Sequence, residues 1–283
     1  LFMYSAGSVV MYIVIWVDDL VILDNHPPTR AKFVAFLTED RKYKITDRGV
    51  LDWVLGMKLT RDRDARTLTL DQSLYVETAC KRFSHHLDSA NLRQFDVPAS
   101  PDLANFSHED APAPGSKEAG DMMAFTAVYF SMIGTLIWLF SATRPELGVA
   151  TSVLSRFSMN PAKKHFSALI RVFLYLRGHK DRRLTLGGKG PDAEVISVVT
   201  DSSHEEGPSL TGVMIVMGSA LIDWFCRRQK SAVRNSTAAE AMANADGADH
   251  GVYIRELAKD FGVDVQITSF YTDNESSIKL HKD

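Results

Sequence analysis

The sequence is poor in cysteine, and this scarcity excludes two classes of protein. Cys80 and Cys226 are the only cysteines among 283 residues. Two thiols cannot form the framework of a disulfide-rich domain, nor a zinc module with several cysteine ligands. The chain also has no Walker loop, no dinucleotide-binding fingerprint and no G-x-S-x-G nucleophile elbow. A reducing compartment inside the cell fits this composition, and we expect an intracellular location.

Long apolar runs are also missing. The longest stretch, Ala127 to Ala142, is interrupted by Ser131, Thr135 and Ser141. It is shorter than the ~20 residues that a membrane helix needs, so we interpret it as a buried core helix. The first residues lack the basic start and the cleavage site of a signal peptide. No membrane partner is therefore expected.

The remaining composition is that of a globular protein, with 45% hydrophobic and 24% charged residues. The formal net charge of −3 alone predicts no polyanionic partner. The distribution of charge is uneven, however, because positions 156–189 hold nine basic residues and a single acid, Asp181. Such a cluster is typical of a phosphate-binding surface, although a solvated helix face would look the same. The stretch 102–121 is the opposite, with five acids and one lysine.

Two breaks divide the chain. Residues 97–122 are rich in proline, glycine and acids, so we expect a long surface linker that buries no core. The second break is the Gly-rich stretch 187–191. The chain begins without Met in an apolar run, which suggests a fragment of something longer. These cuts predict four regions: 1–96, the linker 97–122, a helical region 123–190 and a C-terminal domain 191–283.

Periodicity places secondary structure in each region. Two β hairpins are expected at 9–23 and 55–70, with helices after Pro27-Pro28 and over 73–86. In the middle we expect a helix over 127–141 and another that is capped by Asn160 and ends at Gly178. In the last region we expect strands at 195–200, 210–217, 221–226 and 266–272. A long helix, capped by Ser236 or Thr237, could be broken at Gly247 and Gly251. The expected class is α+β or α/β, with a mixed C-terminal sheet.

Three acids of the last region suggest chemistry. Asp201 ends the first of its strands, Glu240 lies near the start of the long helix, and Asp273 ends the last strand. Carboxylates brought together there would repel one another unless cations lay between them, and oxygen ligands favour Mg²⁺ or Mn²⁺. Two such ions can activate water and stabilise the leaving oxygen of a phosphodiester. Any one of these acids alone is more often a cap or turn residue; the three in this strand order favour a metal site.

These motifs resemble a known family. Thr200-Asp201, 236–240 and Thr272-Asp273-Asn274 are similar to the ribonuclease H domain of copia-type LTR retrotransposons, and so are 210–213 and the turn Arg227-Arg228-Gln229. The resemblance implies a ribonuclease H fold and hydrolysis of RNA in RNA–DNA hybrids. It also implies that Asp201, Glu240 and Asp273 are catalytic metal ligands.

The resemblance extends through the rest of the chain. Trp16-Val17-Asp18-Asp19-Leu20 is similar to the Y-V-D-D-L hairpin of reverse transcriptase, which implies that Asp18 and Asp19 are catalytic metal ligands of the palm. Positions 54–59 fall where the primer-gripping hairpin belongs, so Gly56 and Met57 are expected to contact nucleic acid. Gln72 and Tyr75 fall in the thumb, and 133–136, 142–147 and 175–178 resemble the connection between polymerase and nuclease. Two acids in a hairpin turn are by themselves a common structural feature.

The parent enzyme of such a family copies RNA into DNA and degrades the template. The expected partners are RNA–DNA hybrid and primer–template, with deoxynucleoside triphosphates as substrates. We expect the phosphates of the hybrid to contact two basic clusters. Their residues are Lys163, Lys164, Arg171, Arg177, Arg227, Arg228, Lys230 and Arg234.

The sequence departs from the family at Trp16, where tyrosine is usual, and at Ala238, where an acid is usual. The family's first palm acid lies upstream and its fourth nuclease acid downstream of these motifs, so the polymerase site is expected to be incomplete. A non-catalytic nucleic-acid-binding remnant is therefore the alternative, and the oligomeric state is not predicted.

Overall fold

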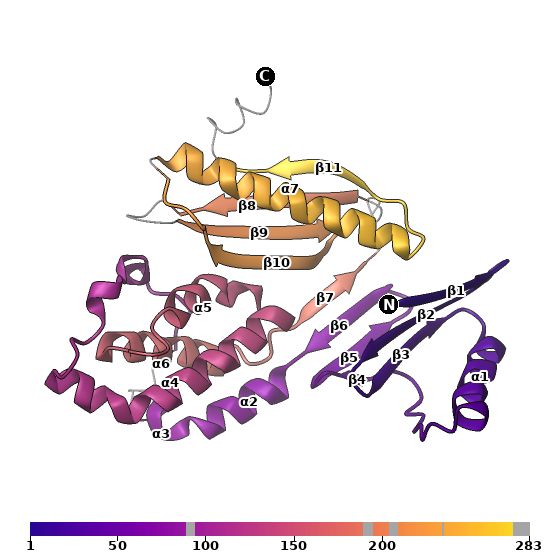
Figure 1. Cartoon of the computed structure of the whole chain (residues 1–283), viewed down its shortest axis with the longest axis horizontal. Coiled ribbons are helices and arrows are strands. Elements are labelled where there is room, and N and C mark those ends of the chain that lie inside the picture. The colour runs from indigo at the N-terminus through magenta and orange to yellow at the C-terminus, as the bar shows by residue number, and fades with distance from the viewer. Residues whose placement is uncertain (89–93, 189–194, 204–208, 234, 274–283) are drawn as a thin grey trace.

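A computed structural model of the chain describes residues 1–88, 94–188, 195–203, 209–233 and 235–273. It contains three β-sheets and seven α-helices in the described residues, so the expected mixed α and β class is confirmed (Figure 1). The sheets have strand orders β1-β2-β3, β4-β5-β6-β7 and β10-β9-β8-β11.

The first sheet carries the expected N-terminal hairpin. Its antiparallel strands are β1 (Phe2–Ala6), β2 (Val9–Trp16) and β3 (Asp19–Asp24). Trp16 pairs with Asp19, which leaves Val17 and Asp18 as the turn. Val17 has a φ of 52°, a left-handed conformation that is unusual for a β-branched residue. Helix α1 (Pro27–Ala35) follows and continues into the π-helical turn η1 (Phe36–Asp40).

The second sheet joins parts of the chain that are far apart in sequence. Strands β4 (Trp53–Val54), β5 (Met57–Asp62) and β6 (Thr67–Asp71) are neighbours along the chain, whereas β7 (Leu184–Gly187) comes more than a hundred residues later. The antiparallel pairing of β6 with β7 places Thr69 opposite Thr185. The N-terminal region and the helical region therefore share one sheet, which the sequence alone did not indicate.

The tight turn between β4 and β5 offers a test of the backbone. Leu55 and Gly56 both have positive φ, 48° and 74°, the conformation of a type I′ turn that favours Asn-Gly. Leu55→Asn is expected to stabilise the protein by about 1 kcal/mol, because a left-handed leucine costs ~1–2 kcal/mol. Denaturant unfolding checks this, and an unfolding midpoint equal to or below that of the unmodified protein would contradict it.

The helical region packs around one large core. Its elements are α2 (Ser73–Arg82), α3 (Ser84–Leu87), η2 (Pro101–Asn105), η3 (His108–Asp110), α4 (Lys117–Ala142), η4 (Pro145–Leu147), α5 (Gly148–Ser155) and α6 (Lys163–Gly178). Tyr129, Leu136 and Phe173 are completely buried in this core. Helices α2 and α3 contribute Val76 and Leu87 to the same cluster, so the region around 73–87 packs against the middle helices.

Three expectations for this region are wrong. Helix α4 begins at Lys117, ten residues before the predicted start, because Ser116 caps it by accepting from the Ala119 amide. Asn160 is not a helix cap, since α6 begins after Ala162 and the Asn160 amide donates to the Pro112 carbonyl. The segment 97–120 also buries core side chains, Leu103 and Phe106.

Among the described residues, one helix, α4, is long and apolar enough to cross a membrane, judged by length and composition alone. Its 26 residues exceed the length that the sequence interpretation assigned to it. One face of α4, with Tyr129, Met132, Leu136 and Leu139, is completely buried in the core. Phe130 and Ile137 on the same helix are exposed, so α4 is a core helix on one face and is not buried all round as expected.

Buried His165 makes stability dependent on pH. Its Nδ1 accepts the Ala162 amide at 2.9 Å, its ring stacks on Phe157 at 3.7 Å, and burial lowers its pKa to about 4. Since the unfolded chain binds this proton near pH 6.5, stability is fully present above that pH and is lost as pH falls toward 4. The loss should be about 3 kcal/mol. His165→Gln keeps an acceptor at this helix position without the titration, so its stability should be flatter between these pH values in thermal unfolding. Equal pH slopes for both proteins would contradict the assignment.

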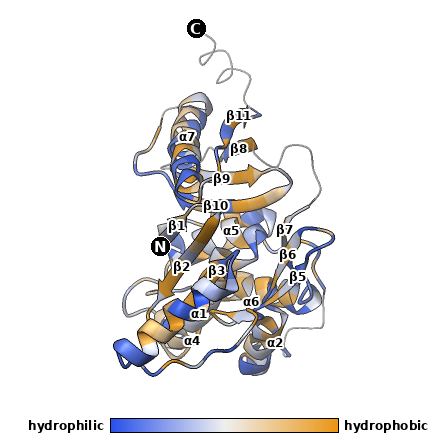
Figure 2. Cartoon of the chain, turned by 90° about the vertical axis from the view of Figure 1, so that its right-hand side faces the viewer, coloured by the Kyte–Doolittle hydropathy of each residue, from blue (hydrophilic) through white to orange (hydrophobic). Residues whose placement is uncertain are grey.

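The third sheet agrees closely with the sequence prediction. Its strands are β8 (Val195–Ser202), β9 (Leu210–Met217), β10 (Ala220–Arg228) and β11 (Gln266–Tyr271). Strands β8, β9 and β10 are antiparallel neighbours, and β11 pairs in parallel with β8. Helix α7 (Ser236–Asp260) crosses this sheet, and Figure 2 shows hydrophobic residues on β9 and β10 beside a more hydrophilic α7.

Helix α7 is continuous through both glycines, so neither of them breaks it. A Cβ at Gly247 would lie 2.4 Å from Thr200 Cγ2, and one at Gly251 would lie 2.9 Å from Val198 Cγ2. The glycines let the helix approach β8 closely. The cap is Asn235, one residue before the predicted position, and its Oδ1 accepts from the Ala238 amide.

Candidate metal centre

The third sheet and α7 bring three acids together. Asp201 lies at the end of β8, Glu240 lies in the second turn of α7, and Asp273 follows β11 by two residues. Because β8 and β11 are parallel neighbours, their C-terminal ends lie at the same edge of the sheet. One carboxylate oxygen from each acid lies within 4.8 Å of the other two. The meeting of Asp201, Glu240 and Asp273 that the sequence predicted is thus present in the structure.

The position of Glu240 depends on how α7 is fixed to β8. The Thr200 hydroxyl donates to Asn244 Oδ1 at 2.5 Å, and both side chains are buried. Asn244 lies one helical turn after Glu240, and Thr200 directly precedes Asp201. This hydrogen bond therefore fixes helix and strand at the level of the two acids, where Gly247 permits close packing.

Glu240 is held more firmly than the other two acids. Only 4% of it is exposed, and its Oε1 accepts from the Ser202 amide at 3.2 Å and the Ser202 hydroxyl at 2.7 Å. The Thr272 hydroxyl donates to Oε2 at 3.4 Å. Asp201 and Asp273 are exposed, so the cluster is open on its solvent side.

Among the described residues, no salt bridge balances the charge of this cluster. In the part of the chain that the structure describes, no lysine, arginine or histidine forms a salt bridge with Asp201, Glu240 or Asp273. A buried carboxylate beside two others is costly without a cation. Three oxygen ligands in this arrangement have the chemistry that Mg²⁺ and Mn²⁺ prefer, so the residues fit a hard divalent cation.

Sequence reasoning missed the residues that support the acids. Gln229 is buried, and its Nε2 donates to Thr211 Oγ1 at 3.0 Å and to the Ala239 carbonyl at 2.8 Å. It thereby ties the end of β10 to the turn of α7 that holds Glu240. The spacing of Asn244 four residues after Glu240 was a usable signal; nothing local marked Gln229 or Ser202 as a partner.

The other proposed acid pair does not form such a cluster. Asp18 and Asp19 are exposed at the turn between β2 and β3. Among the described residues, the group around Asp201 is the one place where three or more acids, cysteines or histidines could hold a metal ion. The two hairpin acids therefore lack a third ligand within the described ranges.

Three basic residues of α6 pair with acids earlier in the chain. Lys163 pairs with Asp121 at 3.3 Å, Lys164 pairs with Asp110, and Arg177 pairs with Asp88 at 3.0 Å. The acidic stretch and the basic helix, which the sequence analysis treated separately, thus neutralise each other in part. Arg171 differs, because no salt bridge joins it to any acid that the structure describes.

The remaining predicted nucleic-acid contacts lie at separate places. Arg227 pairs with Asp246 at 2.9 Å, Arg228 is half-buried beside it, and Lys230 is exposed. Arg234 lies outside the described residues. At the second hairpin, Gly56 is exposed but Met57 is only 7% exposed, so Met57 offers little surface to nucleic acid.

Comparison with known proteins gives relatives over most of the chain. It is 27% identical over 274 residues, 95% of its length, to the retrovirus-related Pol polyprotein from transposon TNT 1-94 of Nicotiana tabacum. It is 25% identical over 93% of its length to the corresponding polyprotein from transposon RE1 of Arabidopsis thaliana. A putative Ty5-1 transposon protein of Saccharomyces cerevisiae is 24% identical over 82% of this chain and 71% of its own length.

The match covers one part of the polyproteins, because the chain spans about a fifth of their length (20% and 17%). No protein-family model matches the chain, and no solved structure matches it. The chain is therefore similar to a segment of retrotransposon Pol polyproteins.

Proposed function

We propose that this chain is the part of a copia-type retrotransposon Pol polyprotein that carries a ribonuclease H-like nuclease, and that it hydrolyses RNA in RNA–DNA hybrids. The observation that carries the proposal is the approach of three carboxylate oxygens to within 4.8 Å of one another. The similarity to transposon Pol polyproteins supports the same family. The sheet order β10-β9-β8-β11, with α7 across it, is compatible with a ribonuclease H fold.

In this proposal Asp201, Glu240 and Asp273 hold Mg²⁺ or Mn²⁺. When bound, the ions supply an activated water and stabilise the leaving oxygen of the cleaved phosphodiester. The protein's own contribution is to hold Glu240 in a fixed position through Ser202 and Thr272, while exposed Asp201 and Asp273 leave the ions accessible to a strand.

The N-terminal region is assigned to the reverse-transcriptase palm and thumb, and 123–190 to the connection. Asp18 and Asp19 would be two palm ligands, and deoxynucleoside triphosphates would be substrates of the whole polymerase. Because Asp18 and Asp19 have no third ligand beside them among the described residues, we expect no primer extension by this chain. Incorporation above that of an Asp18→Asn variant would contradict this expectation.

Nucleic acid would contact the basic residues of α6 and the stretch after β10. Lys230 is exposed, and Arg171 has no carboxylate partner among the described residues, so these two are the most available cations. The salt bridges of Lys163, Lys164 and Arg177 reduce their share of phosphate binding.

The test is cleavage of a hybrid with a label on either strand. The RNA strand should be cut in Mg²⁺ or Mn²⁺, while the DNA strand should stay intact, and EDTA should abolish cutting. Single-stranded RNA of the same sequence is the substrate control.

Two results would overturn the proposal: cleavage that persists in EDTA, or cleavage of the DNA strand at the same rate. Binding of hybrid without metal-dependent cleavage would favour a non-catalytic nucleic-acid-binding remnant instead.

A further inference from the structure

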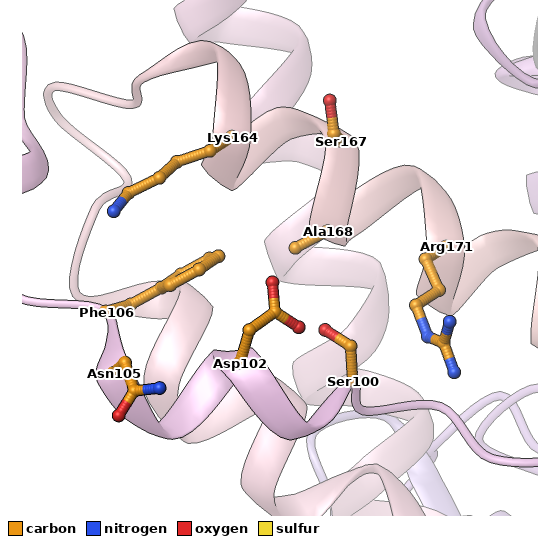
Figure 3. Close-up of a pocket in the computed structure, with 8 residues that line it drawn as sticks. All are labelled: Ser100, Asp102, Asn105, Phe106, Lys164, Ser167, Ala168 and Arg171. Atoms are coloured by element: carbon orange, nitrogen blue, oxygen red, sulfur yellow. The ribbon is translucent and has the colours of Figure 1, made fainter.

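A groove lies between α6 and η2, well outside the metal centre. Its volume is about 600 Å³, within the ~300–1,000 Å³ range of small-molecule sites. One wall is a stripe of α6 that includes Lys164, Ala168 and Arg171; the other includes Ser100 and Asp102 (Figure 3).

Arg171 is prepared to bind an anion. Its guanidinium lies 4.0 Å from the centre of the Phe95 ring, which holds the flat group in place. Its Nε is buried and has no hydrogen-bond partner among the described residues. The neighbouring basic residues Lys163, Lys164 and Arg177 each pair with an acid, whereas Arg171 forms no salt bridge with a described residue. A guanidinium that is held against a ring and pairs with no described carboxylate is suited to recognise phosphate oxygens through its terminal nitrogens.

Asp102 gives the groove a second and opposite feature. Its side chain points into the middle of the groove in Figure 3, with Ser100 beside it on the side of Arg171. The hydrogen bond from Ser100 lowers the pKa of Asp102, and the charges of Arg171 and Lys164 lower it further. The carboxylate is therefore ionised at neutral pH and can only accept hydrogen bonds. A bare phosphate would be repelled there, so a fitting ligand needs a hydroxyl or amine donor next to its anionic group.

We infer that this groove binds one ribonucleotide unit of an RNA strand, with the phosphate on Arg171 and the ribose 2′-hydroxyl donating to Asp102. The 2′-hydroxyl is the donor that DNA lacks, so the groove discriminates RNA from DNA. DNA would leave the Asp102 carboxylate facing its phosphates without a compensating hydrogen bond. The choice of RNA over other ligands with a phosphate and a hydroxyl rests on the proposed function.

The experiment measures the affinity of the full chain for a labelled single-stranded RNA and for DNA of the same sequence, by fluorescence anisotropy in EDTA. EDTA removes divalent cations, so the metal centre adds no metal-bridged contact. Arg171→Ala should weaken binding of both strands by about tenfold, the loss of one charge-assisted contact. Asp102→Ala should weaken RNA binding by about fivefold while leaving DNA binding unchanged or stronger. Lys117→Ala, at an exposed lysine outside the groove, is the charge control.

The opposite response of the two strands to Asp102→Ala is decisive, because a general loss of structure would weaken both. Equal loss for RNA and DNA, or an Arg171→Ala effect no larger than that of Lys117→Ala, would overturn the inference. Competition with adenosine monophosphate tests a free ribonucleotide as the occupant of the groove. Displacement of RNA by adenosine monophosphate, but not by its deoxy form, supports the site. Equal displacement by the two nucleotides overturns the role of Asp102.

Failure of this inference is distinguishable from failure of the proposed nuclease. RNA preference that depends on Asp102 in a chain that cuts no hybrid would support the groove alone. Metal-dependent cleavage of hybrid by a chain without RNA preference would support the nuclease alone.

Discussion

Replacing Asp201 by asparagine is expected to abolish hybrid cleavage and, at the same time, to stabilise the metal-free protein. One carboxylate oxygen of Asp201 lies within 4.8 Å of one from Glu240 and one from Asp273. Loss of one charged ligand removes much of the metal affinity. We expect the rate of hybrid cleavage to fall roughly a hundredfold or more, since each 1.36 kcal/mol of activation free energy is tenfold in rate. Without metal, the same change removes repulsion worth up to about 1 kcal/mol for each pair in a water-like environment.

Both effects can be measured on one preparation. Thermal unfolding in EDTA should show Asp201→Asn a few degrees more stable than the unmodified protein, since ~1 kcal/mol shifts Tm by about 2 °C in a chain of this size. Mn²⁺ at a free concentration a hundredfold above Kd should then stabilise the unmodified protein by about 2.7 kcal/mol and so raise its Tm. The Tm of Asp201→Asn should stay unchanged.

The matched control is Asp249→Asn, which removes one exposed acid from the same helix outside the cluster. It should keep cleavage and the Mn²⁺ response. If Asp201→Asn cut hybrid as fast as Asp249→Asn, the assignment of Asp201 would be wrong.

The C-terminal sheet was predictable because its signals are local. Strand β9 was predicted at its observed residues 210–217, since an apolar run between polar breaks needs no distant partner to become a strand. The pairing of β6 with β7 was not predictable in this way. Leu184–Gly187 is four residues long, and its partner lies more than a hundred residues earlier, so no pattern within it indicates a strand.

The acidic linker shows how tertiary contacts override composition. Proline, glycine and acids predicted a surface crossing, yet Leu103 and Phe106 enter the core and Asp110 pairs with Lys164. The two isolated apolar residues carry no periodicity, and the partner of the acid lies on α6. A count of charge along the sequence cannot show that neighbouring segments neutralise each other.

The three acids of the candidate metal centre were predictable from the sequence, but the residues that support them were not. Asp201 and Asp273 end strands, which the sequence displays, and parallel neighbours meet at one edge. Gln229 and Ser202 reach the site through the fold, and their polar side chains look like any other surface residue in the sequence. The packing role of Gly247 was not predictable for a related reason: a glycine within a helix suggests a break unless the surface that it faces is known.

The packing role of Gly247 leads to a prediction with a clear sign. Gly247→Ala is expected to destabilise the protein, although alanine favours a helix by about 1 kcal/mol over glycine. Its Cβ would lie 2.4 Å from Thr200 Cγ2 and 3.0 Å from Val198 Cγ1, both on β8. Thr200 cannot move freely, because it is buried and its hydroxyl donates to Asn244. Overpacking typically costs ~1–3 kcal/mol, so after the gain in helix propensity we expect a net loss of up to about 2 kcal/mol in denaturant unfolding.

Gly134→Ala is the matched control, because Gly134 lies inside helix α4 with no atom within 4 Å of the added Cβ. It should stabilise by about 1 kcal/mol, so the same substitution in two helices should give opposite signs. Gly247→Ala should also weaken the Mn²⁺ response, since pushing α7 off β8 separates Glu240 from Asp201. A stabilising Gly247→Ala with an unchanged Mn²⁺ response would mean that close contact of α7 with β8 is not what assembles the three carboxylates.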